Sequence, residues 1–109
     1  AGRDAVNALF AELPQRFPGV VRYVPTDAVL GNPDGTWART APGVAGPIRK
    51  VEPDGSPEEH LCQAGAVRLA ELIRAELGAI LPLPASPTGW QQAPWRDDPR
   101  FDDPPGACA

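Results

Sequence analysis

The sequence has no methionine, one lysine (Lys50), one histidine (His60), two serines and two cysteines among its 109 residues. It also lacks a basic patch with interleaved aromatic residues, and its net charge is −4, so nucleic acid is not an expected partner. No stretch reaches the roughly 20 apolar residues that span a bilayer, so we expect no membrane span. Two cysteines and one histidine, without a C-x-x-C pair, are too few for a zinc site. We therefore expect no zinc site.

Proline and glycine are abundant instead, at 15 and 11 residues, which is typical of a loop-rich chain. The 42% of hydrophobic residues nevertheless indicate a core. We expect a domain over residues 1–80 and a proline-rich extended arm over residues 81–109. A free tail seldom carries three large aromatic side chains, so we expect the arm to pack on the domain through Trp90, Trp95 and Phe101.

Residues 4–17 are expected to form a helix with Asp4 as its N-cap. Its apolar stripe consists of Val6, Leu9, Phe10 and Leu13. Because proline lacks an N–H and clashes with the preceding turn, Pro14 predicts that the regular helix ends near Leu13.

The stretch "PGVVRYVP", residues 18–25, is the best strand candidate, since it is short, β-branched and bounded by prolines. Its near-continuous apolarity fits a strand covered on both faces. Residues 31–47 have no periodicity and predict a long loop, in which Trp37 either lines a pocket or, more commonly, pins the loop.

A second helix is expected over residues 63–77, with one apolar stripe and a polar opposite side. Gly78 is predicted to be its left-handed C′ residue, and Cys62 occupies the N-cap position. A lone cysteine pair stays reduced in the cytosol and pairs in an exported protein. We expect Cys62 and Cys108 to be bridged, which would fasten the arm to the domain.

His60 stands directly before this helix, and imidazole can accept and return a proton near neutral pH. Catalysis would require a nucleophile at one ring nitrogen and an orienting acid at the other. The acids near His60 in sequence are Asp54, Glu58 and Glu59. By composition alone, a single histidine at a helix start is more often a solvated surface residue.

The residues "DG…HLCQAGAVRLAELI" resemble the last conserved block of the SGNH (GDSL-type) hydrolases, and the order of expected elements over residues 4–78 is similar to the end of that fold. The resemblance implies an α/β fold, the C-terminal part of a flavodoxin-like three-layer α/β/α sandwich. It also implies a serine esterase or O-acyltransferase that needs no cofactor and acts on ester-linked acyl groups, such as those of cell-envelope polymers or lipids. His60 would then be the general base.

The family places an aspartate three residues before this histidine, where the chain has Pro57, which cannot orient an imidazole. Asp54 is our preferred substitute, with Glu58 or Glu59 as weaker ones and a backbone carbonyl as a further possibility.

The family's Gly-Asp-Ser nucleophile block is also missing, and neither Ser56 nor Ser86 has a strand-to-helix context. We therefore expect the chain, which opens on "AGRD", to be the C-terminal half of such a domain. The N-terminal half, upstream or on another chain, would supply the serine, and the protein would work outside the cytoplasm. The alternative is a small exported, non-catalytic binding domain that uses its aromatic, proline-rich arm.

Overall fold

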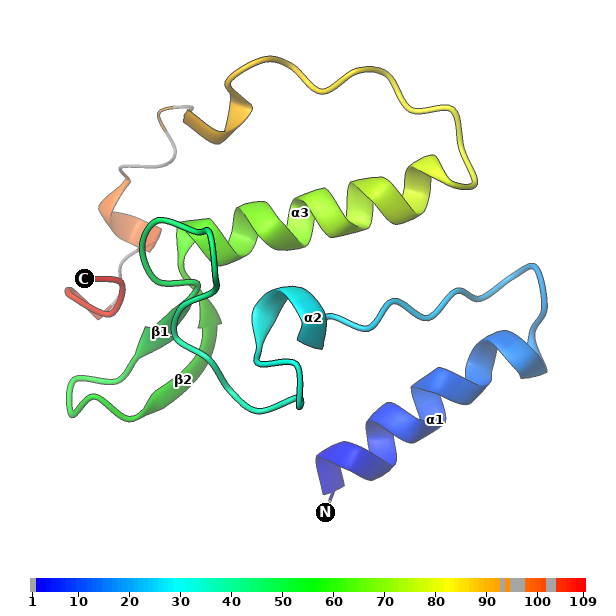
Figure 1. The fold of residues 1–109 in the computed structure, drawn as a ribbon, viewed down its shortest axis with the longest axis horizontal. Helices are drawn as coiled ribbons and strands as arrows, with labels where there is room; N and C mark the ends of the chain where they lie inside the picture. Colours follow the sequence, from blue (N-terminus) through cyan, green and yellow to red (C-terminus); the bar gives the residue numbers. More distant parts are fainter. Residues whose placement is uncertain (1, 93, 95–97, 102–103) are drawn as a thin grey trace.

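A computed structural model describes residues 2–92, 94, 98–101 and 104–109 of the chain. Its helices are α1 (Gly2–Arg16), α2 (Asp27–Leu30) and α3 (Gln63–Gly78). Its strands are β1 (Arg49–Val51) and β2 (Pro57–Leu61), and the 3-10 turns η1 (Trp90–Gln92) and η3 (Pro99–Phe101) lie in the arm. Figure 1 shows α3 as the long central element, with the hairpin at its start and α1 standing apart.

The strands form an antiparallel hairpin in which Arg49 pairs with Leu61 and Val51 with Pro57. The "DG" pair at its tip supplies the turn, because Gly55 adopts a φ of 81° that other residues rarely reach. The buried apolar residues gather where the hairpin, α2, the start of α3 and the C-terminus meet. They are Leu30, Ala38, Ile48, Cys62 and Ala107.

The start of α3 is fixed against this core by a close backbone contact. The N–H of Cys62 donates to the Ile48 carbonyl at 3.1 Å. A Cβ on Gly65 would lie 2.0 Å from that same oxygen, so only glycine allows α3 to approach so closely. Cys62 is the N-cap residue, as predicted, with extended φ and ψ of −76° and 169°.

Helix α1 runs past Pro14 to Arg16, so the prediction that it ends near Leu13 was wrong. A proline removes only its own N–H from the helix ladder, and the turn beyond it is held by other bonds. The Phe17 N–H donates to the Leu13 carbonyl at 2.9 Å, and Arg16 pairs with Glu12 at 2.9 Å. Asp4 lies inside the first turn rather than at the N-cap.

The predicted strand over residues 18–25 was also wrong. Residues 18–20 form a turn and residues 21–26 are extended without strand pairing. A strand exists only through its neighbour's backbone groups, and the described part of the chain brings no second strand beside this segment. Figure 1 shows it passing between α3 and α1.

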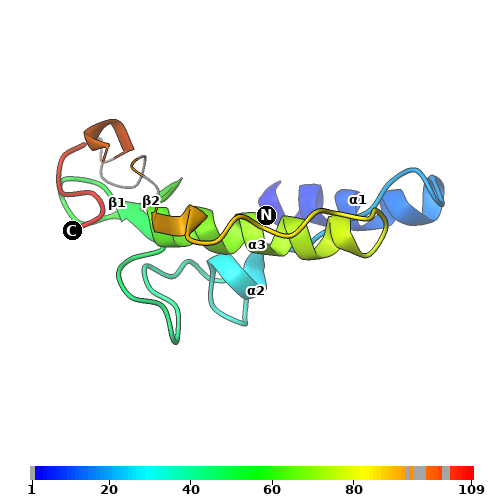
Figure 2. The ribbon, with the colours of Figure 1, turned by 90° about the horizontal axis from the view of Figure 1, so that it is seen from above.

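The end of α3 differs from prediction as well. Gly78 is the last helical residue and is not left-handed; the C-cap is Ala79, with φ of −72° and an N–H that donates to the Ala75 carbonyl at 3.2 Å. The arm then turns back along α3, as Figures 1 and 2 both show.

The disulfide between Cys62 and Cys108 is present, as predicted, and closes the arm onto the start of α3. Trp90 is partly buried, whereas the predicted anchoring of Trp95 and of the Phe101 side chain lies outside the described residues. The predicted loop over residues 31–47 is confirmed, since its only ladder contact is an isolated bridge between Gly31 and Trp37. The fold is thus mixed α/β, with helices and a two-stranded antiparallel sheet.

Candidate functional site

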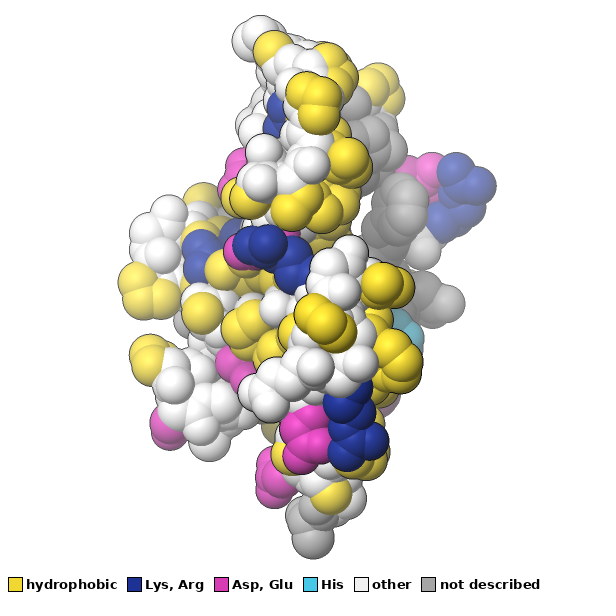
Figure 3. Space-filling model, turned by 90° about the vertical axis from the view of Figure 1, so that its right-hand side faces the viewer, with side chains coloured by type: hydrophobic (Ala, Val, Ile, Leu, Met, Phe, Trp, Pro, Cys, Tyr) yellow, Lys and Arg dark blue, Asp and Glu magenta, His cyan; other side chains and the backbone are white. Residues whose placement is uncertain are grey.

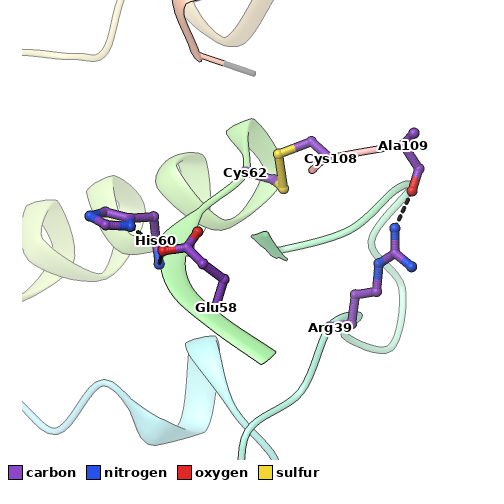
Figure 4. Close-up of a disulfide and its surroundings, with 6 residues drawn as sticks. All are labelled: Arg39, Glu58, His60, Cys62, Cys108 and Ala109. Atoms are coloured by element: carbon purple, nitrogen blue, oxygen red, sulfur yellow. Dashed lines mark hydrogen bonds and ion pairs between the residues drawn. A yellow bond between two sulfur atoms is a disulfide. The ribbon is translucent and has the colours of Figure 1, made fainter. Parts of the chain in front are cut away.

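His60 lies on strand β2 and not in a loop before the helix. Side chains two residues apart on a strand share a face, so Glu58 lies beside it. The Glu58 carboxylate oxygen Oε1 contacts the imidazole Nδ1 and also accepts the backbone N–H of His60 at 3.1 Å. Figure 4 shows this pair on β2, with the ring pointing away from the disulfide.

The two members of the pair differ in exposure. The Glu58 side chain is only 13% exposed, whereas that of His60 is 82% exposed. Burial raises the pKa of Glu58, but hydrogen bonds from the ring and N–H of His60, together with the charge of the His60 ring when it is protonated and the charge of Lys50, lower that pKa below its ordinary value overall. Glu58 is therefore an ionised carboxylate near neutral pH.

The second carboxylate oxygen of Glu58, Oε2, is buried and has no hydrogen-bond partner among the described residues. An unsatisfied buried oxygen is costly, but the positive charge of the nearly buried Lys50 acts favourably on this carboxylate. The site thus combines an ionised, shielded acid with an accessible imidazole.

Asp54, the acid preferred from the sequence, bonds to its neighbour Ser56 at the tip of the hairpin. Its Oδ1 accepts the Ser56 N–H at 2.9 Å. Hydrogen bonds from the Ser56 side chain and backbone lower the pKa of Asp54. Within the described part of the chain, no hydrogen bond or ion pair joins Asp54 to His60, so the structure does not bring the two predicted site residues together.

Two side chains fix the backbone of β2 around the pair. Trp37 Nε1 donates to the Glu58 carbonyl at 2.9 Å, so the long loop is pinned by its aromatic residue. Arg49 reaches across the hairpin, donating to the Glu59 carbonyl at 2.9 Å and to the Leu30 carbonyl at 2.7 Å. The carboxylate is therefore held by a braced strand.

The sequence favours Asp54 over Glu58 and predicts no strand over Pro57–Leu61, which the structure shows to be β2. The strand-forming signal is weak there, since "PEEH" is proline-bounded and acidic. The "DG" turn signal could have indicated the hairpin. With a strand assigned, alternation alone would have put Glu58 and His60 on one face.

A cleft of about 890 Å³ lies between residues 43–47, the first half of α3 and the arm. Both Cys62 and Cys108 line it, whereas His60 does not. The cleft therefore does not surround the imidazole.

Two further properties concern only the residues that the structure describes. They contain no cluster of three or more histidine, cysteine, aspartate or glutamate side chains suited to a metal ion. None of their helices combines the length and apolarity that crossing a membrane requires.

No protein-family model matches this chain, and no curated protein or solved structure is significantly similar to it.

Proposed function

We propose that this chain carries the general base of an SGNH-type serine esterase or O-acyltransferase acting on ester-linked acyl groups. Glu58, rather than Asp54, is the acid that orients His60. The observation that carries the proposal is the contact between His60 Nδ1 and the shielded Glu58 carboxylate, with the ring itself exposed.

The protonation of this pair follows from the acid. An ionised carboxylate has no proton to donate, so the contact requires the hydrogen on His60 Nδ1. A neutral imidazole protonated at Nδ1 has its lone pair at Nε2. That nitrogen is free to accept a proton from a nucleophile, which is the state a general base needs.

The reaction passes through an acyl-enzyme in two steps. As a serine oxygen bonds to the acyl carbon of the ester, its proton moves to His60 Nε2 and is delivered to the departing alkoxide. Water or an acceptor hydroxyl next gives its proton to Nε2 and attacks the acyl-enzyme. The bond from the acyl carbon to the serine oxygen breaks, and that oxygen takes the proton back from Nε2. The Glu58 charge stabilises the imidazolium that forms in both steps.

The serine belongs to a polypeptide segment other than these 109 residues, upstream or on another chain. Ser56 is engaged with Asp54 at the hairpin tip. Ser86 lies in the arm, outside any strand or helix. Neither follows a strand that leads into a helix, as the resemblance requires.

We also propose that the protein works outside the cytoplasm. The bridge between Cys62 and Cys108 supports this location, because structural disulfides persist mainly in oxidising compartments.

The test measures hydrolysis of a generic acyl ester, p-nitrophenyl acetate, by the natural protein that contains these residues. We expect His60→Ala to lower kcat/KM by about 10³-fold or more, since the general base is lost. Glu58→Gln should lower it by about 10²-fold or more, because the neutral amide neither fixes the Nδ1–H tautomer nor stabilises the imidazolium.

Asp54→Asn is the matched control, since it changes an acid in the same hairpin and should leave kcat/KM within about threefold. If Asp54→Asn is the damaging substitution and Glu58→Gln is neutral, the assignment of the acid is wrong. Full activity of His60→Ala would rule out the esterase proposal altogether.

A further inference from the structure

The extended segment 21–24 has the sequence of a strand but no strand partner in the described part of the chain. Its residues are Val21, Arg22, Tyr23 and Val24. In the described part of the chain, the N–H and C=O groups of residues 22–24 make no hydrogen bond to another residue. A row of free backbone groups along an extended, apolar segment is a template for strand pairing.

The segment has a helix on either side, as Figure 1 shows. It is tied to α3 through Arg22, whose Nε lies 2.7 Å from Glu76 Oε2. Helix α1 lies opposite, joined to the segment through the turn at residues 17–20. The order of α3, the extended segment and α1 corresponds to one helix, one strand and one helix of a three-layer α/β/α arrangement.

The apolar residues of the two helices beside this segment, and of the turns that follow each helix, lack cover. On the α1 side, Val6, Leu9, Phe10, Phe17 and Val20 are between 47% and 84% exposed. On the α3 side, Ile73, Leu77, Ile80 and Leu81 are between 39% and 58% exposed. Figure 3 shows hydrophobic side chains spread over this end of the molecule, with charged groups between them. Exposed apolar surface of this extent marks an interaction site.

The excess surface is large enough for a stable interface. A compact protein of 11.5 kDa exposes about 5,800 Å², whereas this chain exposes 7767 Å². The difference of about 2,000 Å² includes surface on the arm and the loops as well as on these helices, and it exceeds the roughly 800 Å² that one partner buries in a standard interface. The radius of gyration agrees, at 15.9 Å against about 13 Å expected for this length.

We infer that residues 21–24 join, as a strand, the open edge of a β-sheet in the serine-bearing polypeptide, and that α1 and the far half of α3 then cover the two faces of the combined sheet. This rests on the proposed function for the identity of the partner. A sheet edge provides the missing backbone partners, and its two apolar faces provide the missing cover for the helices.

A second copy of this chain fits the surface less well. Pairing two copies through this segment would build a sheet of only two strands, each with its other edge still open. Apolarity on both faces, as in "VVRYV", is instead typical of strands inside a multi-stranded sheet between helices.

The test is amide hydrogen exchange on the natural protein, with Tyr23→Pro as the disrupting variant. N–H groups alternate in direction along a strand that pairs on one side, so either Tyr23 or both Arg22 and Val24 would donate to the partner. We expect those amides to exchange at least about 10³-fold more slowly than an open segment. Tyr23→Pro removes a donor that the structure leaves unbonded, so the hairpin and α3 should persist by circular dichroism and disulfide mapping. If Tyr23 is the protected amide, this variant should abolish the pairing and expose α1 to proteolysis. If Arg22 and Val24 are protected, Val24→Pro should have these effects instead, since an edge strand tolerates proline where the N–H points outward. Ala85→Pro, in the exposed arm, is the matched control and should change neither.

Each outcome decides one claim. Fast exchange at every amide of residues 22–24 in the natural protein overturns the strand-pairing inference, even if the esterase activity is found. Slow exchange together with unaffected activity of His60→Ala supports strand pairing while rejecting the proposed function and the serine-bearing identity of the partner. A mass by light scattering equal to two copies of a protein without a serine block would assign the surface to self-association and overturn the inference.

Discussion

At the scale of single residues, the pair of Glu58 and His60 joins a shielded group to an exposed one. Shielding the carboxylate from solvent strengthens its hydrogen bond to the ring, because the effective dielectric constant is lower inside the protein than in water. The ring stays accessible, as a group that exchanges protons with a second molecule must be. The same arrangement makes the fold depend on the charge of Glu58.

The pH dependence of stability should reveal that charge. The pKa of Glu58 in the folded protein lies below its ordinary value of 4.5. The unfolded chain therefore binds a proton more readily than the folded chain as the pH falls. The stabilisation of the fold by ionised Glu58 is complete above about pH 4.5, the ordinary pKa, and is lost as the pH drops through the lower pKa of the folded protein. Urea unfolding between about pH 6 and pH 3 should show a steeper loss for the wild type than for Glu58→Gln.

The comparison with Glu58→Gln isolates this residue from other acids with lowered pKa values. Asp34 and Asp98 have such values through hydrogen bonds from Thr36 and Arg100, respectively, and remain in both proteins. Parallel pH curves for the wild type and Glu58→Gln would show that the ion pair adds no stability in solution.

At the scale of elements, the contact of α3 with the residue before β1 determines where the site lies. The Ile48 carbonyl accepts the Cys62 N–H, and Gly65 leaves room for that oxygen. Since His60 is two residues before Cys62, a shift at the start of α3 would displace the imidazole as well.

Gly65→Ala should therefore destabilise the fold by about 2–3 kcal/mol or more, because a Cβ there overlaps a backbone oxygen in the core. Gly78→Ala, in the same helix, is the control: its Cβ would meet only a Leu83 side-chain atom, at 4.0 Å. Alanine should be neutral there or stabilise the helix by up to about 1 kcal/mol. Equal urea midpoints for the two variants would contradict the close approach.

The elements that could be predicted from the sequence are those whose signals are local. The α3 stripe depends on helical periodicity within one segment, and it located the helix to within one residue. The hairpin was not predicted because its strands are polar. Their stability comes from contacts with residues distant in the sequence, such as the bond from Trp37 to β2. The strand predicted over residues 18–25 was wrong for the opposite reason. These residues have strand propensity, but a strand forms only where a neighbouring strand pairs with it.

At the scale of the whole molecule, the bridge between Cys62 and Cys108 closes a loop with a sequence separation of 46 residues. Constraining the unfolded chain over a loop of this size stabilises the fold by about 4 kcal/mol in the chain-entropy model. The arm adds further contacts, since the Val51 N–H donates to the Ala107 carbonyl at 3.1 Å and Arg39 donates to the Ala109 carbonyl.

Replacing both cysteines by serine should thus lower the free energy of unfolding by about 4 kcal/mol, measured by urea titration without reductant. Wild-type protein in reductant should behave like the variant. Unchanged stability in both cases would mean that the arm is held by its non-covalent contacts alone. Intact mass with and without reductant, differing by about 2 Da, confirms beforehand that the bridge has formed.

The closed loop also determines what a protease can do to this protein. The exposed stretch over residues 84–89, with its prolines and no helix or strand, is where a single cut would fall. Such a cut adds one water molecule but releases nothing, because the disulfide still joins the two pieces. The nicked protein would keep His60, Glu58 and the start of α3 bound to the severed arm. The damage would become visible only on a reducing gel.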